Sequence, residues 1–147
     1  MSLLSPADQE RLRESFEEMT GSVRVLFFTQ TLDGDQCLQT RQILDELPLL
    51  SDKIAIEEVN FVLEKDKAAQ YGIDRVPALA LLSQDAHGQT RDTRIRFLGT
   101  PSGYEFVSLV QALMLAGGHE SQLTPANRVR VEGVTTPTTI QVFSTPT

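Results

Sequence analysis

Residues 75–82 read Arg-Val-Pro-Ala-Leu-Ala-Leu-Leu, in which Pro77 is followed by five apolar residues. The stretch from Pro77 to Leu82 has the length of a buried β-strand. Its proline fits only the first position or an edge strand, because proline cannot donate a hydrogen bond to the sheet. His87-Gly88 marks a turn and residues 93–98 form another strand-like run, so we expect an antiparallel hairpin here.

Two strand-like segments precede this hairpin, with a helical segment between them. Residues 23–29 read Val-Arg-Val-Leu-Phe-Phe-Thr, which is typical of a strand buried on both faces. After a polar loop at 30–36, a helix that ends at Pro48 presents one apolar face: Cys37, Ile43, Leu44 and Leu47. Residues 54–62 form the next strand, and a slip of its alternation within residues 56–59 predicts a bulge. This βαβ order implies parallel strands joined by a right-handed crossover.

Helices flank both halves of the chain. Ser5-Pro6 predicts the N-cap and first residue of an N-terminal helix. Residues 65–71 form a short helix capped by Gly72, and an apolar helical stripe over 106–114 is closed by Gly117-Gly118. The order helix, β, α, β, α, β, β, α predicts an α/β three-layer sandwich, with a four-stranded mixed sheet and an extra N-terminal helix.

Composition limits the function classes. The chain has 147 residues, of which 40% are hydrophobic, enough for one domain with a core. A formal net charge of −7 and a pI near 4.8 argue against binding to nucleic acid or to an anionic membrane surface. No segment approaches the roughly 20 apolar residues of a spanning helix, and residues 1–6 show no leader signal. We expect a soluble cytoplasmic protein, whose single Cys37 fits a reducing compartment.

Several segments carry a resemblance to a known family. They lie at residues 40–47 with 50–53, 71–78 and 96–106. Over about residues 5–117 the chain resembles the thioredoxin fold, and more narrowly the N-terminal half of the protein disulfide oxidoreductases. These are glutaredoxin-like proteins built from two tandem thioredoxin folds, and the N-terminal domain of alkyl hydroperoxide reductase flavoproteins is related. The resemblance implies a thioredoxin-like domain that serves cell redox homeostasis.

The resemblance also locates the redox motif, which reads Gly34-Asp35-Gln36-Cys37. Redox-active members carry Cys-x-x-Cys at the start of the helix after the first strand. Cys37 matches the second cysteine, and Gly34 replaces the first, which holds the attacking thiol. A dithiol cycle needs one thiolate to attack and a second to resolve the mixed disulfide. We therefore expect a vestigial site that cannot run this cycle alone.

The resemblance assigns further roles near this motif. It implies a cis peptide bond between Val76 and Pro77, facing an extended substrate. Cys37 is expected to be a buried, inert residue on the core face of its helix. We expect no cofactor, and no metal, because His87 and His119 lie far apart and one cysteine completes no ligand set.

The residues that follow this part of the chain show a different pattern. Residues 118–136 are polar and predict a linker, with a short extended piece at 129–131. Residues 138–143 read Thr-Thr-Ile-Gln-Val-Phe, a strand-like run, and residues 140–147 resemble the first strand of the family's second thioredoxin unit. We therefore expect a thioredoxin-like domain over 1–117, a linker over 118–136 and the first strand of a truncated second unit over 137–147. If ordered, strand 138–143 is expected to pair with a neighbouring chain in a dimer.

Three functions follow from these expectations. The first is a redox-inactive domain that supports or docks for thiol–disulfide exchange carried by a missing second Cys-x-x-Cys domain. Its partners would be that second domain of a longer chain, and disulfide-containing proteins or a thioredoxin-reductase-like flavoprotein. The second is a monothiol redox protein that forms mixed disulfides through Cys37 with glutathione or a protein. The third is a peptide-binding module that uses the face around Pro77.

Overall fold

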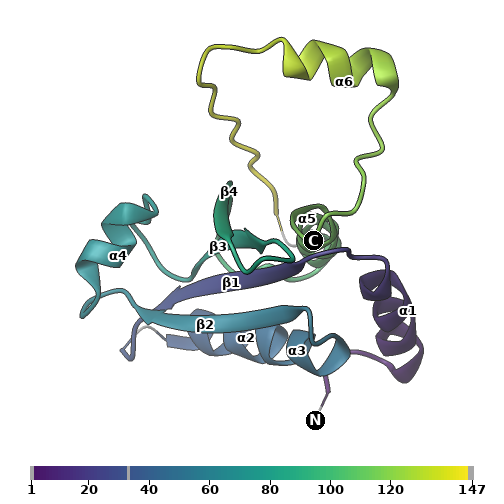
Figure 1. Cartoon of the computed structure of the whole chain (residues 1–147). Coiled ribbons are helices and arrows are strands. Elements are labelled where there is room, and N and C mark those ends of the chain that lie inside the picture. The colour runs from purple at the N-terminus through teal and green to yellow at the C-terminus, as the bar shows by residue number, and fades with distance from the viewer. Residues whose placement is uncertain (1, 33, 146–147) are drawn as a thin grey trace.

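A computed structural model describes residues 2–32 and 34–145. Its elements, labelled in Figure 1, are α1 (Pro6–Glu17), β1 (Ser22–Thr29), α2 (Gly34–Asp45), α3 (Leu47–Leu50), β2 (Ile54–Asn60), α4 (Lys65–Gln70), β3 (Ala78–Gln84), β4 (Thr90–Leu98), α5 (Tyr104–Ala116) and α6 (Pro125–Glu132). The strands form one sheet in the order β2-β1-β3-β4. The β1–β2 pair is parallel and the other two pairs are antiparallel, which confirms the predicted mixed sheet. Among the described residues, no helix is both long and apolar enough to cross a membrane.

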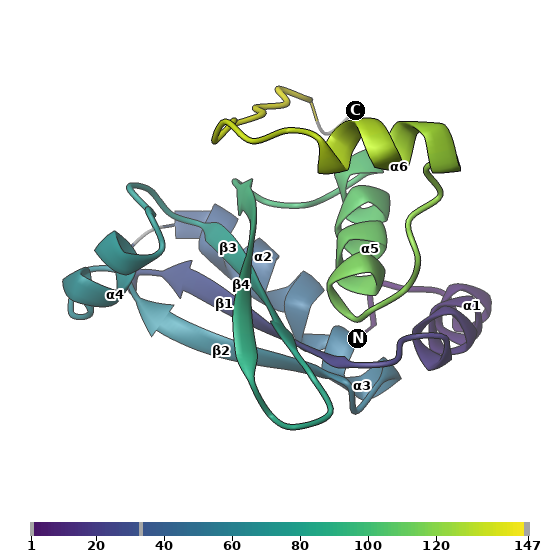
Figure 2. The ribbon, with the colours of Figure 1, turned by 45° about the horizontal axis from the view of Figure 1, so that its top comes forward.

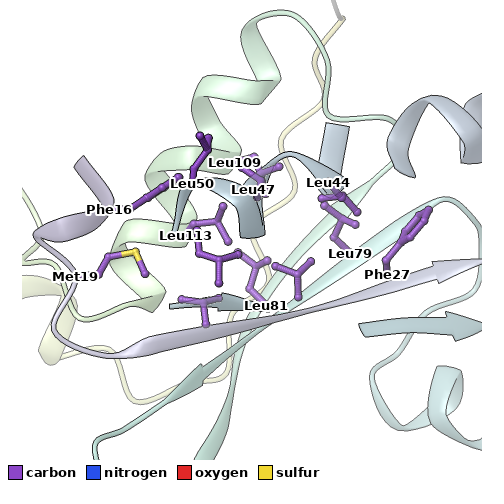
Figure 3. Packing of buried hydrophobic residues seen from close by; sticks show 13 residues of the cluster. Phe16, Met19, Phe27, Leu44, Leu47, Leu50, Leu79, Leu81, Leu109 and Leu113 are labelled. Carbon is purple, nitrogen blue, oxygen red and sulfur yellow. The ribbon is translucent and has the colours of Figure 1, made fainter. Parts of the chain in front are cut away.

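The central strand β1 separates two apolar layers, because its successive side chains point to opposite faces. Val25 and Phe27 face the larger cluster, which α1, α2, α3 and α5 complete. Leu26 and Phe28 face a smaller cluster, which includes Ala68 of α4. Figure 3 shows how side chains from several helices meet in the larger cluster above the sheet. The chain is therefore a three-layer α/β sandwich with an extra N-terminal helix, as predicted.

The N-terminal helix begins where the sequence indicates. The Ser5 hydroxyl accepts a hydrogen bond from the Asp8 backbone N–H at 3.2 Å, and Pro6 occupies the first turn. At the other end, Phe16 is fully buried in the larger cluster. The cap thus determines where α1 begins, and the packing of Phe16 fastens the helix to the domain.

The structure corrects three local expectations. Residues 34–36 belong to α2 and not to the preceding loop, and Pro48 lies in the first turn of α3, where its missing N–H leaves no bond unmade. The bulge predicted within 56–59 is absent, because β2 pairs with β1 in unbroken register up to Asn60. Its alternation slips because β2 is an edge strand with a partly exposed face. The irregularity lies instead in the β3–β4 pair, where Arg94 adopts a φ of 65°.

The C-terminal part differs most from expectation. The predicted extended piece at 129–131 is wrong, since these residues lie in α6, which Thr124 caps by accepting from the Asn127 N–H at 3.3 Å. Figures 1 and 2 show α6 standing away from the sheet, and it contains no buried residue. Residues 138–143 form no strand and are exposed. The assignment of 137–147 to a second unit remains a prediction, and residues 146 and 147 lie outside the described range.

Candidate functional site

The residues singled out in the sequence meet at one end of the sheet. Strand β1 ends at Thr29 and α2 begins at Gly34. In the antiparallel β1–β3 pair Phe28 lies opposite Ala78, which puts Pro77 beside the end of β1. On the other side, Thr29 lies opposite Asn60 of β2. The start of α2 and the proline that precedes β3 therefore lie at the same end of the sheet. The reason is that α2 follows the end of β1, and the antiparallel strand β3 begins beside that end.

The part of the site around Pro77 is held by backbone contacts. The Val76–Pro77 peptide bond is cis, the form that the resemblance implied. The Gly99 N–H donates to the Pro77 carbonyl at 2.9 Å. Pro77 is buried and Val76 is half-buried, and the role of either residue toward a substrate remains a prediction.

The charged pair next to this proline lies on the surface. Asp74 accepts a hydrogen bond from the Arg75 guanidinium at 2.8 Å, which lowers the pKa of the Asp74 carboxyl. Both side chains are mostly exposed, so the pair contributes little to stability. It is part of the surface beside the site and not of its interior.

A short hydrogen-bond network joins the proline side to α2. The buried Thr40 hydroxyl donates to the Gln36 carbonyl at 2.8 Å and lies 3.0 Å from the Thr100 hydroxyl. The Thr100 hydroxyl also donates to the same carbonyl at 3.3 Å. Because Gly99 bonds to Pro77 and Thr100 bonds to Gln36, the segment between β4 and α5 bridges the two halves of the site. The sequence did not point to Thr40 or Thr100, whose only signal is their position in the matched segments.

The first turn of α2 separates an exposed position from a buried one. Gly34, Asp35 and Gln36 are exposed, whereas Cys37 is only 5% exposed. A Cβ atom built on Gly34 would meet no atom within 4 Å. The structure therefore has open space for a side chain at the position that matches the attacking cysteine, and it encloses the sulfur of the second.

A cavity of about 290 Å³ lies on the β2 side of this turn, away from the proline. Its walls include Thr29 of β1, Cys37 and Arg41 of α2, and Glu58 and Asn60 of β2. Arg41 and Glu58 form an ion pair of 2.6 Å across one wall. The sequence analysis missed the β2 residues of this cavity, because only the parallel register brings them beside Thr29. Over residues 2–32 and 34–145, no group of three His, Cys, Asp or Glu side chains could hold a metal ion.

The fold and the arrangement of residues at this end of the sheet define the class of protein: the chain is a thioredoxin-like domain. Among solved structures, it is similar to the N-terminal domain of the alkyl hydroperoxide reductase AhpF from Enterococcus faecalis V583. The identity is 30%, the match covers 87% of this chain and 59% of the other, and the TM-score is 0.77. A protein disulfide oxidoreductase from Aeropyrum pernix K1 shares the fold at 23% identity, with 88% of this chain and 54% of the other covered and a TM-score of 0.69. No family profile matches the chain.

Curated sequences point to the same component of alkyl hydroperoxide reductase. The AhpF protein of Xanthomonas campestris pv. phaseoli is 41% identical over 80 residues, 54% of this chain and 12% of that protein. The Escherichia coli K12 protein is 29% identical over 113 residues, 76% of this chain and 18% of that protein. This chain therefore spans less than a fifth of the length of either relative. In particular, it resembles the N-terminal domain of AhpF.

Proposed function

We propose that this chain is a redox-inactive thioredoxin-like domain of a glutaredoxin-like protein disulfide oxidoreductase, and that it supports or docks for exchange carried by a second Cys-x-x-Cys domain. The observation that carries this proposal is the first turn of α2, with a glycine at the exposed position and the only cysteine buried behind it. The attacking position carries no thiol, so no dithiol cycle can start there. The burial of Cys37 supports this function over a monothiol enzyme, which needs an accessible thiolate.

The remainder of the chain supports a docking role. Ile140, Val142 and Phe143 expose their side chains almost completely, as expected for a segment that packs against a unit outside this chain. The similar AhpF proteins are much longer than this chain. We place the domain in the cytoplasm and propose that the partners of the complete protein are disulfide-containing proteins or a thioredoxin-reductase-like flavoprotein.

Insulin reduction by dithiothreitol tests the proposal directly. We expect the chain itself to give the uncatalysed rate, and a Gly34→Cys variant to accelerate the reaction, because the new side chain enters open space three residues before a second thiol that is already in place. Gly34→Ser serves as the matched control, since it adds a side chain of similar size without the thiol. Activity of the unmodified chain that disappears in Cys37→Ser would overturn the redox-inactive assignment.

A further inference from the structure

Helix α5 carries apolar side chains on both of its faces. Leu109 and Leu113 are fully buried in the larger cluster above the sheet. Tyr104, Val107 and Leu115 recur at helical spacing on the opposite face, where they are 79%, 55% and 47% exposed. A helix that is apolar all round is normally covered on both sides. The outer stripe of α5, formed by Tyr104, Val107 and Leu115, is therefore a surface that another element can cover.

The C-terminal arm, residues 121–145, carries apolar side chains that are exposed. Figures 1 and 2 show its helix α6 apart from the sheet, and α6 contains no buried residue. Val129 of α6 is 67% exposed, and Ile140 and Val142 beyond it are each 84% exposed. Ile140 and Val142 are two residues apart, so in an extended chain their side chains share one side and that of Phe143 points to the other. Burial of these side chains against an apolar surface would stabilise an association.

Contacts at the end of α5 fix where the chain leaves this helix. The Gly21 N–H donates to the Gly117 carbonyl at 2.8 Å, and the His119 Nε2 lies 3.0 Å from the Glu18 carboxylate. These contacts hold the residues after α5 against the end of α1, and the arm continues from there toward α6 (Figure 1). With this exit the arm leaves the outer stripe of its own α5 exposed. A second copy can bring its arm onto the stripe without breaking these contacts.

The distribution of charge favours a second copy as the partner. Residues 121–147 contain two basic side chains, Arg128 and Arg130, and one acidic side chain, Glu132, so the whole net charge of −7 arises in residues 1–120, the body. Two acidic bodies repel each other, whereas the slightly basic arm of one copy is attracted to the body of the other. The outer stripe of α5 contains no charged residue, so covering it buries no unpaired charge.

The area of such a contact is that of a small but specific interface. Helix α5 has 13 residues and is therefore about 20 Å long. A helix beside an extended segment is about 15 Å wide, so an arm laid along α5 covers about 300 Å². Two reciprocal contacts, counted on both copies, bury about 1,200 Å², the lower end of the range for stable interfaces. We propose that two copies of this chain exchange C-terminal arms, with Val129, Ile140 and Val142 of each copy on the outer stripe of the other. This association concerns the chain itself and does not depend on the proposed docking function.

Sedimentation velocity as a function of concentration tests the association. We expect the mass to rise from 16.3 kDa toward twice that value, with a Kd of about 10–100 μM. Val107→Asp on α5 and Val142→Asp on the arm should each weaken the dimer by about tenfold or more, because each buries a charge in an apolar contact. Leu63→Asp, at a position that is 81% exposed and outside both surfaces, is the control and should leave the Kd unchanged. Thermal unfolding checks that every variant is folded. A monomer at every concentration would overturn the proposal, as would equal effects of the three variants.

Cross-linking shows whose arm lies on α5. Gln111, between Val107 and Leu115 on α5, and Gln141 on the arm are both exposed, whereas the native Cys37 is buried. A short bifunctional maleimide should link Gln111→Cys chains to Gln141→Cys chains in a mixture, and should link either variant to itself much less. Gln70→Cys in place of Gln111→Cys is the control and should give little product, because Gln70 is an exposed residue of α4. A double variant, Gln111→Cys with Gln141→Cys, that cross-links only within one chain would mean that the arm folds back on its own α5, and would overturn the exchange.

Discussion

Replacing Phe16 with alanine should destabilise the protein strongly, because this residue fastens the extra helix α1 to the domain. Phe16 is 0% exposed and belongs to the larger apolar cluster together with Leu47 and Leu50 of α3. Figure 3 shows its side chain near that of Leu50. The substitution leaves a cavity where α1 meets α3, since the backbone of a closely packed core relaxes only in part.

The magnitude follows from the buried area. A phenylalanine buries about 150–250 Å², and at about 25 cal/mol per Å² this corresponds to about 4–6 kcal/mol as an upper bound. Alanine keeps part of that burial and the cavity adds a penalty, so we expect a loss of about 3–5 kcal/mol in the free energy of unfolding. For a chain of 147 residues each kcal/mol lowers Tm by about 2–4 °C, so Tm should fall by about 6–20 °C.

Urea unfolding followed by circular dichroism measures this loss. Phe143→Ala is the matched control, because it makes the same chemical change at a side chain that is 90% exposed, and it should alter stability by less than about 0.5 kcal/mol. A loss below about 1 kcal/mol for Phe16→Ala, with an unchanged denaturant slope, would show that α1 does not pack against the core as described. Equal losses in the two variants would refute the reasoning for the C-terminal segment as well.

Two further predictions concern the site and the edge of the sheet. Thr40→Val should lower stability by about 1 kcal/mol, because it removes the hydrogen bond that the buried Thr40 hydroxyl donates to the Gln36 carbonyl and its contact with the Thr100 hydroxyl; chemical unfolding that gives no loss would contradict the network. Arg96 donates to Asp92 and lowers the pKa of that carboxyl below its ordinary value. The stabilisation is therefore complete above the unfolded pKa and is lost as pH falls through the folded pKa, below about pH 4. Thermal unfolding between about pH 5 and pH 2 should show a smaller loss for Asp92→Asn than for the unmodified chain, and equal losses would contradict this linkage.

Elements with strong local signals were predictable. Ser5 caps α1 as expected, because an N-cap depends on a hydroxyl and a backbone N–H three residues apart. Pro77 stands directly before β3, where a missing N–H removes no ladder bond. Predictions failed where the neighbouring strand or helix decides the outcome. The alternation of β2 suggested a bulge because an edge strand has no fully buried face to enforce the period.

The residues of the candidate site also differ in whether the sequence predicted them. The roles of residues 34–37 and 76–77 were predicted from the resemblance to the thioredoxin-like family, which rests on short segments that are read along the chain itself. The bridge through Thr100 and the cavity beside Thr29 were not, because their members are separated by dozens of residues and meet only through strand register. A pattern search along one strand cannot detect such pairs.

The sequence by itself determined the order of the strands and main helices from α1 to α5, without α3, the mixed α/β character and the absence of a second thiol. These properties depend on local periodicity, caps and residue identity, which need no knowledge of distant contacts. The burial of Cys37 was predicted from its place on the apolar face of its helix. Only the tertiary structure decided that Gly34 faces open space and that Arg41 and Glu58 pair beside Thr29. The physical reason is that burial and pairing arise from the packing of α2 on a sheet whose strands come from separate parts of the chain.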